Sequence, residues 1–186
     1  GCGGTDRPPY CQEHGGLSIT AAIDKYVYVT VTKPFEKGIH LKYSKLEHAQ
    51  SVEEVQHTII REALRMMEVE PQLDLVTLAD IPAGTGLGSS SSLATATLLA
   101  LAKFRHKTLV PHDLAEMASL IEIYELKAPI GRQDQYASAF GGIQFMEFRP
   151  NGYVQHLPIN LSQDTIVDLE ENLMLFFTGY TRDTND

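Results

Sequence analysis

The chain has 186 residues, with 15 Lys and Arg against 24 Asp and Glu, which gives a formal net charge of −9. This acidic balance argues against a partner with a phosphate backbone, so we expect no nucleic-acid binding. The sequence shows no signal-peptide pattern and no apolar run of transmembrane length, and Cys2 and Cys11 form neither a metal-type pair nor a disulfide framework. We therefore expect a cytoplasmic protein that does not bind membranes.

The first part of the chain predicts three strands and one helix. Segments rich in β-branched and aromatic residues, which are typical of strands, lie at 17–23, 25–33 and 39–43. Apolar residues recur at helical spacing over 52–67, which predicts an amphipathic helix. Ser51 and Glu54 have the spacing of a capping box at the start of this helix.

The remainder of the chain predicts a mixture of strands and helices. A strand over 73–80 precedes a loop rich in glycine and serine, and the apolar run over 93–102 predicts a buried helix after that loop. The later expected elements are a helix over 111–126, a short helix over 134–139, a hairpin of 143–148 and 153–157 around the turn at 150–152, and a buried strand over 173–177.

The loop over 82–92 is the most informative feature of the sequence. Gly84, Gly86 and Gly88 stand at alternate positions, which lets backbone N–H groups turn toward one point. The first turn of the following helix adds free N–H groups and the positive end of the helix dipole. Such a loop suits an anion such as phosphate, whereas the alternative is a turn that only caps a helix. It lacks the Lys of a Walker A loop and the glycine spacing of a dinucleotide site.

Three ordered motifs resemble the GHMP kinase family, which includes galactokinase, homoserine kinase, mevalonate kinase and phosphomevalonate kinase. The loop is similar to the family's ATP-binding sequence Pro-x-x-x-Gly-Leu-Gly-Ser-Ser. Two further segments resemble the sugar-binding and catalytic segments of the heptose 7-phosphate kinase branch. These are Gly3-Gly4-Thr5-Asp6-x-Pro8-x-Tyr10 and Gly131-Arg-Gln-Asp-Gln-Tyr136, the latter followed by Phe140-Gly-Gly142. The resemblance covers nearly the whole chain.

The resemblance implies an α+β fold, that of the GHMP kinase amino-terminal domain. In this fold a mixed sheet packs on helices, with the left-handed β-α-β topology of a ribosomal-protein domain. It divides the chain into an ATP-binding domain over 1–160 with a truncated first strand, and a linker with the start of a second α+β domain over 161–186. Complete members are much longer, so we expect this span to be a fragment or a renumbered segment that is inactive alone. A homodimer is compatible with the resemblance.

The resemblance also implies ATP and Mg²⁺ as cofactors. The residues that match ATP binding lie in the loop and at the start of its helix: Pro82, Gly84, Gly86, Leu87, Gly88, Ser89, Ser90 and Ser91. Glu122 matches the position that coordinates Mg²⁺, together with the hydroxyl of Ser89 or Ser90, since Mg²⁺ takes few protein oxygens besides phosphate and water. Glu125 competes for this role, and a solvated glutamate on a helix is the simpler alternative.

Asp134 matches the family's catalytic aspartate, which takes or orients the proton of the acceptor hydroxyl. The alternative is an aspartate that caps a helix. The basic residue that partners this aspartate in the family would precede Gly1.

The sugar-binding segment of the family matches Gly4, Thr5, Asp6 and Tyr10. A carboxylate such as that of Asp6 can accept hydrogen bonds from two adjacent hydroxyls, which fixes the orientation of a sugar ring. Alternatively, Asp6 only begins a Pro-rich turn. Gly3 and Gly4 replace the Glu-His pair of galactokinases, which argues against galactose and for the heptose branch.

These matches imply a kinase whose partners are ATP and a small sugar or sugar phosphate. The leading acceptor is the anomeric hydroxyl of D-glycero-D-manno-heptose 7-phosphate. One alternative is a galactose- or fucose-type kinase, and another is a non-catalytic regulator that binds ATP and sugar. The presence of Asp134 favours an enzyme, because a regulator could lose this residue at no cost.

Overall fold

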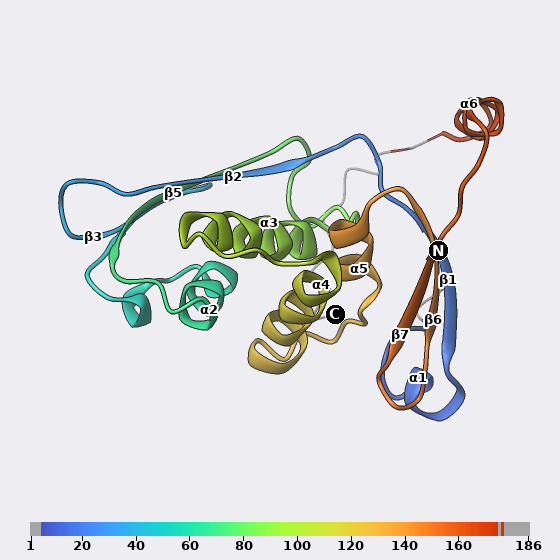
Figure 1. Ribbon diagram of the computed structural model, residues 1–186, viewed down its shortest axis with the longest axis horizontal. Coiled ribbons are helices and arrows are strands. Elements are labelled where there is room, and N and C mark those ends of the chain that lie inside the picture. The colour runs from blue at the N-terminus through green and yellow to red at the C-terminus, as the bar shows by residue number, and fades with distance from the viewer. Residues whose placement is uncertain (1–4, 175, 177–186) are drawn as a thin grey trace.

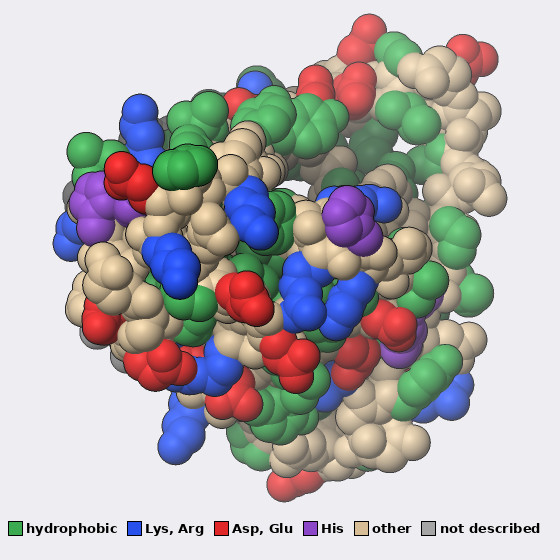
Figure 2. Space-filling model, turned by 60° about the vertical axis from the view of Figure 1, so that its left-hand side comes forward, with side chains coloured by type: hydrophobic (Ala, Val, Ile, Leu, Met, Phe, Trp, Pro, Cys, Tyr) green, Lys and Arg blue, Asp and Glu red, His purple; other side chains and the backbone are tan. Residues whose placement is uncertain are grey.

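Two β-sheets and a central group of helices make up the fold, as Figure 1 shows. The computed structural model describes residues 5–174 and 176. The expected α+β fold, with a mixed sheet packed on helices, is confirmed. On the face that Figure 2 shows, acidic and basic side chains lie interspersed.

The larger sheet has four strands in the order β2-β5-β3-β4. These are β2 (Val27–Thr32), β3 (Gly38–Lys42), β4 (Leu46–Ala49) and β5 (Gln72–Ala79). Strand β5 runs antiparallel to β2 and parallel to β3, so the sheet is mixed. Leu73 and Leu75 of β5 are fully buried, as the two-residue period of a strand covered on one face requires. Sequence patterns miss β4, a short edge strand in which only Ala49 is buried.

The smaller sheet has three antiparallel strands in the order β1-β6-β7. These are β1 (Gly16–Ala21), β6 (Ile143–Phe148) and β7 (Val154–Pro158). Strands β6 and β7 form the predicted hairpin, and at its turn the Arg149 N–H donates to the Tyr153 carbonyl (2.9 Å). Because β1 pairs Gly16 with Phe148, the start of the described chain lies beside residues far along the sequence.

The helices are α1 (Tyr10–His14), α2 (Thr58–Met66), α3 (Ser89–Phe104), α4 (Pro111–Ser119), α5 (Gln133–Phe140) and α6 (Gln163–Glu171), with a 3₁₀ turn η1 (Val52–Glu54) and a π-helical segment η2 (Leu120–Glu125). Helices α3, α4 and α5 lie between the two sheets, whereas α1 and α6 lie outside this group (Figure 1). Helix α3 packs along β2, and α2 packs on α3. The main core lies between these helices and the larger sheet, with Ile39, Leu64 and Leu98 fully buried. Burial of this apolar surface is the main favourable term in folding.

The prediction of one helix over 52–67 is wrong at its start. The chain makes the turn η1, continues extended through Val55, and begins α2 only at Thr58. Val55 is fully buried in this extended conformation, so packing overrides the helical spacing of the sequence. The side chain of Ser51 does not cap the turn, and the Glu54 carboxylate instead accepts a hydrogen bond from the Gln50 N–H (2.8 Å).

Other differences concern the ends of elements and the last described residues. The helix expected over 111–126 changes from α4 to the π-helical η2 at Leu120. Sequence patterns also miss α1 and α6, and α6 has no buried residue and projects away from both sheets (Figure 1). Of the buried strand expected over 173–177, residues 173, 174 and 176 are exposed and outside any strand, while 175 and 177 lie outside the described residues. Within the described part of the chain, every helix is too short or too polar to span a bilayer.

Candidate active site

The predicted phosphate loop joins β5 to α3, as the strand–loop–helix order requires. Helix α3 begins at Ser89, directly after Gly88. The φ angles of Gly84, Gly86 and Gly88 are 79°, 75° and 71°, in the left-handed region that residues with side chains rarely adopt. The alternate glycines therefore give the loop a conformation that other residues would strain.

The amino-terminal end of α3 is accessible to a ligand. Gly88 offers no side chain to cap the helix, while Ser90 and Pro82 are exposed and Leu87 is 40% exposed. The Pro82 carbonyl accepts a hydrogen bond from the Thr85 hydroxyl (3.2 Å), which closes the loop. The N–H groups of the first helical turn and the helix dipole both favour an anion at this position.

Asp134 lies directly against this loop. A Cβ atom placed on Gly88 would be 3.4 Å from the Asp134 Cγ, so the carboxylate occupies the space beside the last glycine. The hydroxyls of Ser92 and Ser138 are 3.0 Å apart and join α5 to α3. The N-cap of α5 is Arg132, so the alternative that Asp134 only caps this helix is wrong.

Asp6 contacts the start of α5, the helix that carries Asp134. Its Oδ2 accepts a hydrogen bond from the Gln133 N–H (3.1 Å), across 127 positions of sequence. A Cβ atom on Gly131 would be 2.0 Å from this same oxygen, so only glycine leaves room for the Asp6 carboxylate here. The Thr5 hydroxyl donates to the Leu17 carbonyl (3.1 Å), which ties the segment to β1. The fold therefore joins the predicted sugar-binding and catalytic segments.

The pKa of Asp134 is raised above its ordinary value. Asp134 keeps solvent access, yet the surrounding protein atoms remove part of its hydration, and this desolvation is the largest cause. The negative charge of Asp6 raises the pKa further, the contact with Gln133 lowers it, Glu122 raises it and Arg7 lowers it. A carboxylate with a raised pKa is a better proton acceptor when it is ionised.

Glu122 is buried behind the start of α3. It lies on the π-helical segment η2, a kind of turn that is often found at functional sites, and it is only 2% exposed. Its Oε2 accepts hydrogen bonds from the Ser91 hydroxyl and from Gln135 Nε2, both at 2.7 Å. The structure thus brings Glu122 to Ser91, while the hydroxyl of Ser89 turns toward the Pro82 carbonyl (3.5 Å).

A Mg²⁺ ion at this loop would have to be held mainly by nucleotide phosphates. Among the described residues, no three His, Cys, Asp or Glu side chains gather as a metal cage would require. Mg²⁺ in nucleotide sites needs only one or two protein oxygens. Asp6 and Glu122 both raise the pKa of Asp134, which shows an accumulation of negative charge that a divalent cation would offset.

The Ser91–Glu122 bond leads to a prediction about stability. Ser91→Ala should lower the free energy of unfolding by about 1–3 kcal/mol, because it removes one of two donors from a buried carboxylate. Chemical denaturation measures this change. Ser90→Ala is the control, since Ser90 is exposed in the same turn and should change stability by less than about 0.5 kcal/mol. Equal losses in both variants would contradict the prediction.

The other residues of the predicted sugar-binding segment are Gly4, Thr5 and Tyr10. Thr5 and Tyr10 line one hollow of about 490 Å³ between α1, β1 and the end of β6, and Tyr10 is 51% exposed. Gly4 lies outside the described residues. Sequence reasoning does not name Gly131 and Gln135 as site residues, although both belong to the predicted catalytic segment that carries Asp134.

The chain is similar to known proteins over most of its length. Residues 35–142 match the family model of the GHMP kinases N terminal domain. A D-glycero-alpha-D-manno-heptose 7-phosphate kinase of Campylobacter jejuni is 31% identical, over 99% of this chain and 58% of that protein. A crystal structure of a D-glycero-D-manno-heptose 1-phosphate kinase from Bacteroides thetaiotaomicron is 30% identical, with a TM-score of 0.84 over 90% of this chain and 59% of that chain. That of a putative sugar kinase from Campylobacter jejuni is 30% identical, with a TM-score of 0.78 over 91% of this chain and 55% of that chain.

The chain therefore belongs to the GHMP kinase family, and the resemblance drawn from its three motifs is confirmed. It spans between 55% and 59% of the lengths of these three relatives.

Proposed function

We propose that the complete protein transfers a phosphoryl group from ATP to a hydroxyl of a sugar or sugar phosphate. The observation that carries the proposal is that Asp134 lies beside Gly88 of the phosphate loop, while the N–H of the preceding residue, Gln133, donates to the Asp6 carboxylate. A nucleotide phosphate on the loop and a sugar hydroxyl on Asp6 would then meet at Asp134. Phosphoryl transfer requires mainly this kind of positioning.

In this proposal the proton of the acceptor hydroxyl passes to the Asp134 carboxylate. The acceptor oxygen forms a bond to the γ-phosphorus while the bond between that phosphorus and the β,γ-bridging oxygen breaks, so ADP leaves. The loop N–H groups hold the phosphates, and Asp6 orients the sugar hydroxyls. Bound Mg²⁺, held by Ser90 and Glu122, would neutralise charge on the phosphates.

We propose D-glycero-D-manno-heptose 7-phosphate as the acceptor, through its anomeric hydroxyl. The support is the Gly3-Gly4-Thr5-Asp6 motif together with the relatives named as heptose-phosphate kinases. An assay of ADP release by the full-length protein, with heptose 7-phosphate, galactose and fucose, tests this choice. Turnover with the heptose alone is expected. Turnover only with galactose or fucose would make that sugar the acceptor in place of the heptose. Binding of sugar without any turnover would favour a non-catalytic regulator.

The raised pKa of Asp134 predicts a displaced pH profile. Proton acceptance requires the ionised carboxylate, so kcat/KM should fall as the pH drops through the pKa of Asp134. This acidic limb should lie above the ordinary value for an aspartate, about 3.9. Asp6→Asn should move the limb toward lower pH, because the charge of Asp6 contributes to the raised pKa. An acidic limb at the ordinary value in the unsubstituted enzyme would contradict the assignment.

A further inference from the structure

Helix α5 is short, and its position decides where the Asp134 carboxylate lies. It has only eight residues, and glycines flank it at Gly131 and at Gly141, the latter with a φ of 68°. Chain connectivity alone therefore holds this helix weakly, because glycine permits many backbone conformations. Side-chain contacts must fix its orientation.

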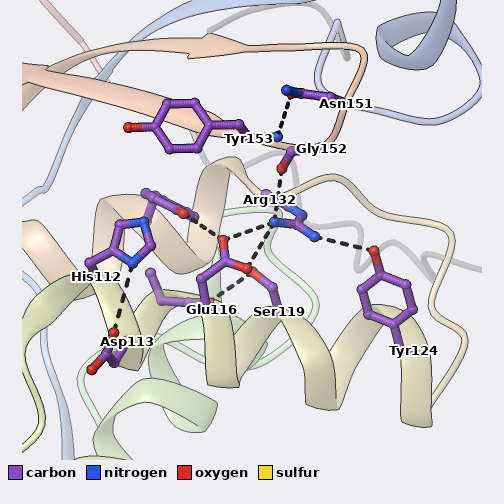
Figure 3. A network of polar contacts seen from close by, with 11 residues as sticks. His112, Asp113, Glu116, Ser119, Tyr124, Arg132, Asn151, Gly152 and Tyr153 are labelled. Carbon is purple, nitrogen blue, oxygen red and sulfur yellow. Dashed lines mark hydrogen bonds and ion pairs between the residues drawn. The ribbon is translucent and has the colours of Figure 1, made fainter.

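The first of these contacts comes from Arg132, the N-cap residue of α5 (Figure 3). Its Nη1 donates to both carboxylate oxygens of Glu116 on α4, at 2.8 and 3.0 Å. The same guanidinium donates to the Gly152 carbonyl in the β6–β7 turn (3.1 Å) and to the Tyr124 hydroxyl on η2 (3.2 Å). One side chain thus joins the start of α5 to three other elements.

The second contact comes from Tyr136, one helical turn later. This side chain is fully buried, and its hydroxyl donates to Glu116 Oε1 at 2.5 Å. Its ring stacks on Phe140, with the two centroids 5.9 Å apart. Burial raises the pKa of Tyr136, and its bond to Glu116 raises it further, so the phenol remains protonated and keeps donating.

Arg132 and Tyr136 make their contacts from one face of α5, and Asp134 lies on another face. Arg132 and Tyr136 are four positions apart, a spacing that places both side chains on the same side of a helix. Asp134, midway between them, points instead to Gly88. Its two neighbours are held as well, since the Gln133 N–H bonds to Asp6 and the Gln135 side chain bonds to Glu122.

We propose that Glu116, Arg132 and Tyr136 form a positioning clamp that sets the distance of the Asp134 carboxylate from the phosphate loop. This inference rests on the proposed function of Asp134. The three residues contact neither the loop nor Asp6 through the bonds described, so they act through the placement of α5. A partly buried ion pair is weak evidence for stability alone, because desolvation offsets much of its attraction. Misplacement of a reacting group by about 1 Å, however, costs about 100-fold in rate.

Glu116→Gln and Tyr136→Phe in the full-length protein test the clamp. Each should lower kcat by about 10- to 100-fold while KM for ATP stays nearly unchanged, because the loop and α3 are intact. The matched control is Glu62→Gln on α2. Glu62 is buried and bonded to Arg61 (3.2 Å) and Arg65 (2.5 Å), and both of these bonds stay within α2. Loss of kcat in the control as large as in Glu116→Gln would overturn the clamp.

Amide hydrogen exchange gives a readout that does not depend on turnover. Exchange over residues 134–140 should be faster in Glu116→Gln than in the unsubstituted protein, and unchanged in Glu62→Gln. If no sugar is phosphorylated by the unsubstituted protein but this pattern appears, the proposed function fails and the clamp stands. If the protein is an active kinase but Glu116→Gln changes neither kcat nor exchange in α5, the clamp is wrong and the function stands.

Discussion

Asp134→Asn in the full-length protein should lower kcat by about 10²- to 10⁴-fold, the usual contribution of a positioned acid or base. The amide has nearly the same shape as the carboxylate but cannot accept the proton of the acceptor hydroxyl. Because Asp134 lies beside Gly88 without supplying the N–H groups of the loop, ATP affinity should hardly change. Steady-state kinetics together with a nucleotide titration separate the two effects.

The matched control for this variant is Asp113→Asn. Asp113 lies in the first turn of α4, as Asp134 lies in the first turn of α5, but its neighbour is the His112 imidazole, with Nδ1 3.9 Å from Oδ1. This control should keep kcat within about twofold, in line with the small effects of surface substitutions. Near-normal turnover of Asp134→Asn would move the catalytic role to another residue.

Gly131→Ala should lower kcat/KM for the sugar by about 100-fold, although it adds a single methyl group. The new Cβ would be 2.0 Å from Asp6 Oδ2 and 2.6 Å from the Asp6 carbonyl oxygen, so the whole residue must move. Displacement of Asp6 would also break its bond to the Gln133 N–H at the start of α5. The loss should appear in sugar kinetics, while nucleotide affinity and far-ultraviolet circular dichroism stay the same.

Gly141→Ala at the other end of α5 provides the matched control. A Cβ there meets nothing within 4 Å, but the φ of 68° makes alanine unfavourable by about 1–2 kcal/mol. This variant therefore measures the general cost of losing a glycine beside α5. If it lowers kcat/KM as strongly as Gly131→Ala, displacement of Asp6 is not the cause.

The sequence predicts the loop and α3 well, because the evidence is local. The glycines at 84, 86 and 88 and the apolar run after them report on neighbouring backbone, and α3 follows the loop as these patterns indicate. The prediction of a capping box at Ser51 is wrong because the evidence that decides this segment is not local. Burial of Val55 comes from tertiary packing, which the spacing of residues in the chain does not reveal.

The same distinction separates the predictable site residues from the overlooked ones. Asp134 and Asp6 stand in motifs that resemble a known family, whereas Glu116 is one acidic residue on an amphipathic helix and carries no local signal. Its partners Arg132 and Tyr136 become meaningful only once α4 and α5 lie side by side. The bond between Glu122 and Ser91 likewise joins residues 31 positions apart, and Glu122 lies on the π-helical η2, which helical periodicity does not predict.

The bond between Asp6 and the Gln133 N–H has a consequence for how the protein acquires its site. These residues are 127 positions apart, so forming their hydrogen bond requires the closure of a very long loop, which lowers the conformational entropy of the chain. Contacts of such high sequence separation form slowly, and during synthesis Asp6 must wait until α5 has been made. A sugar that binds to Asp6 only in the folded chain would therefore raise the free energy of unfolding.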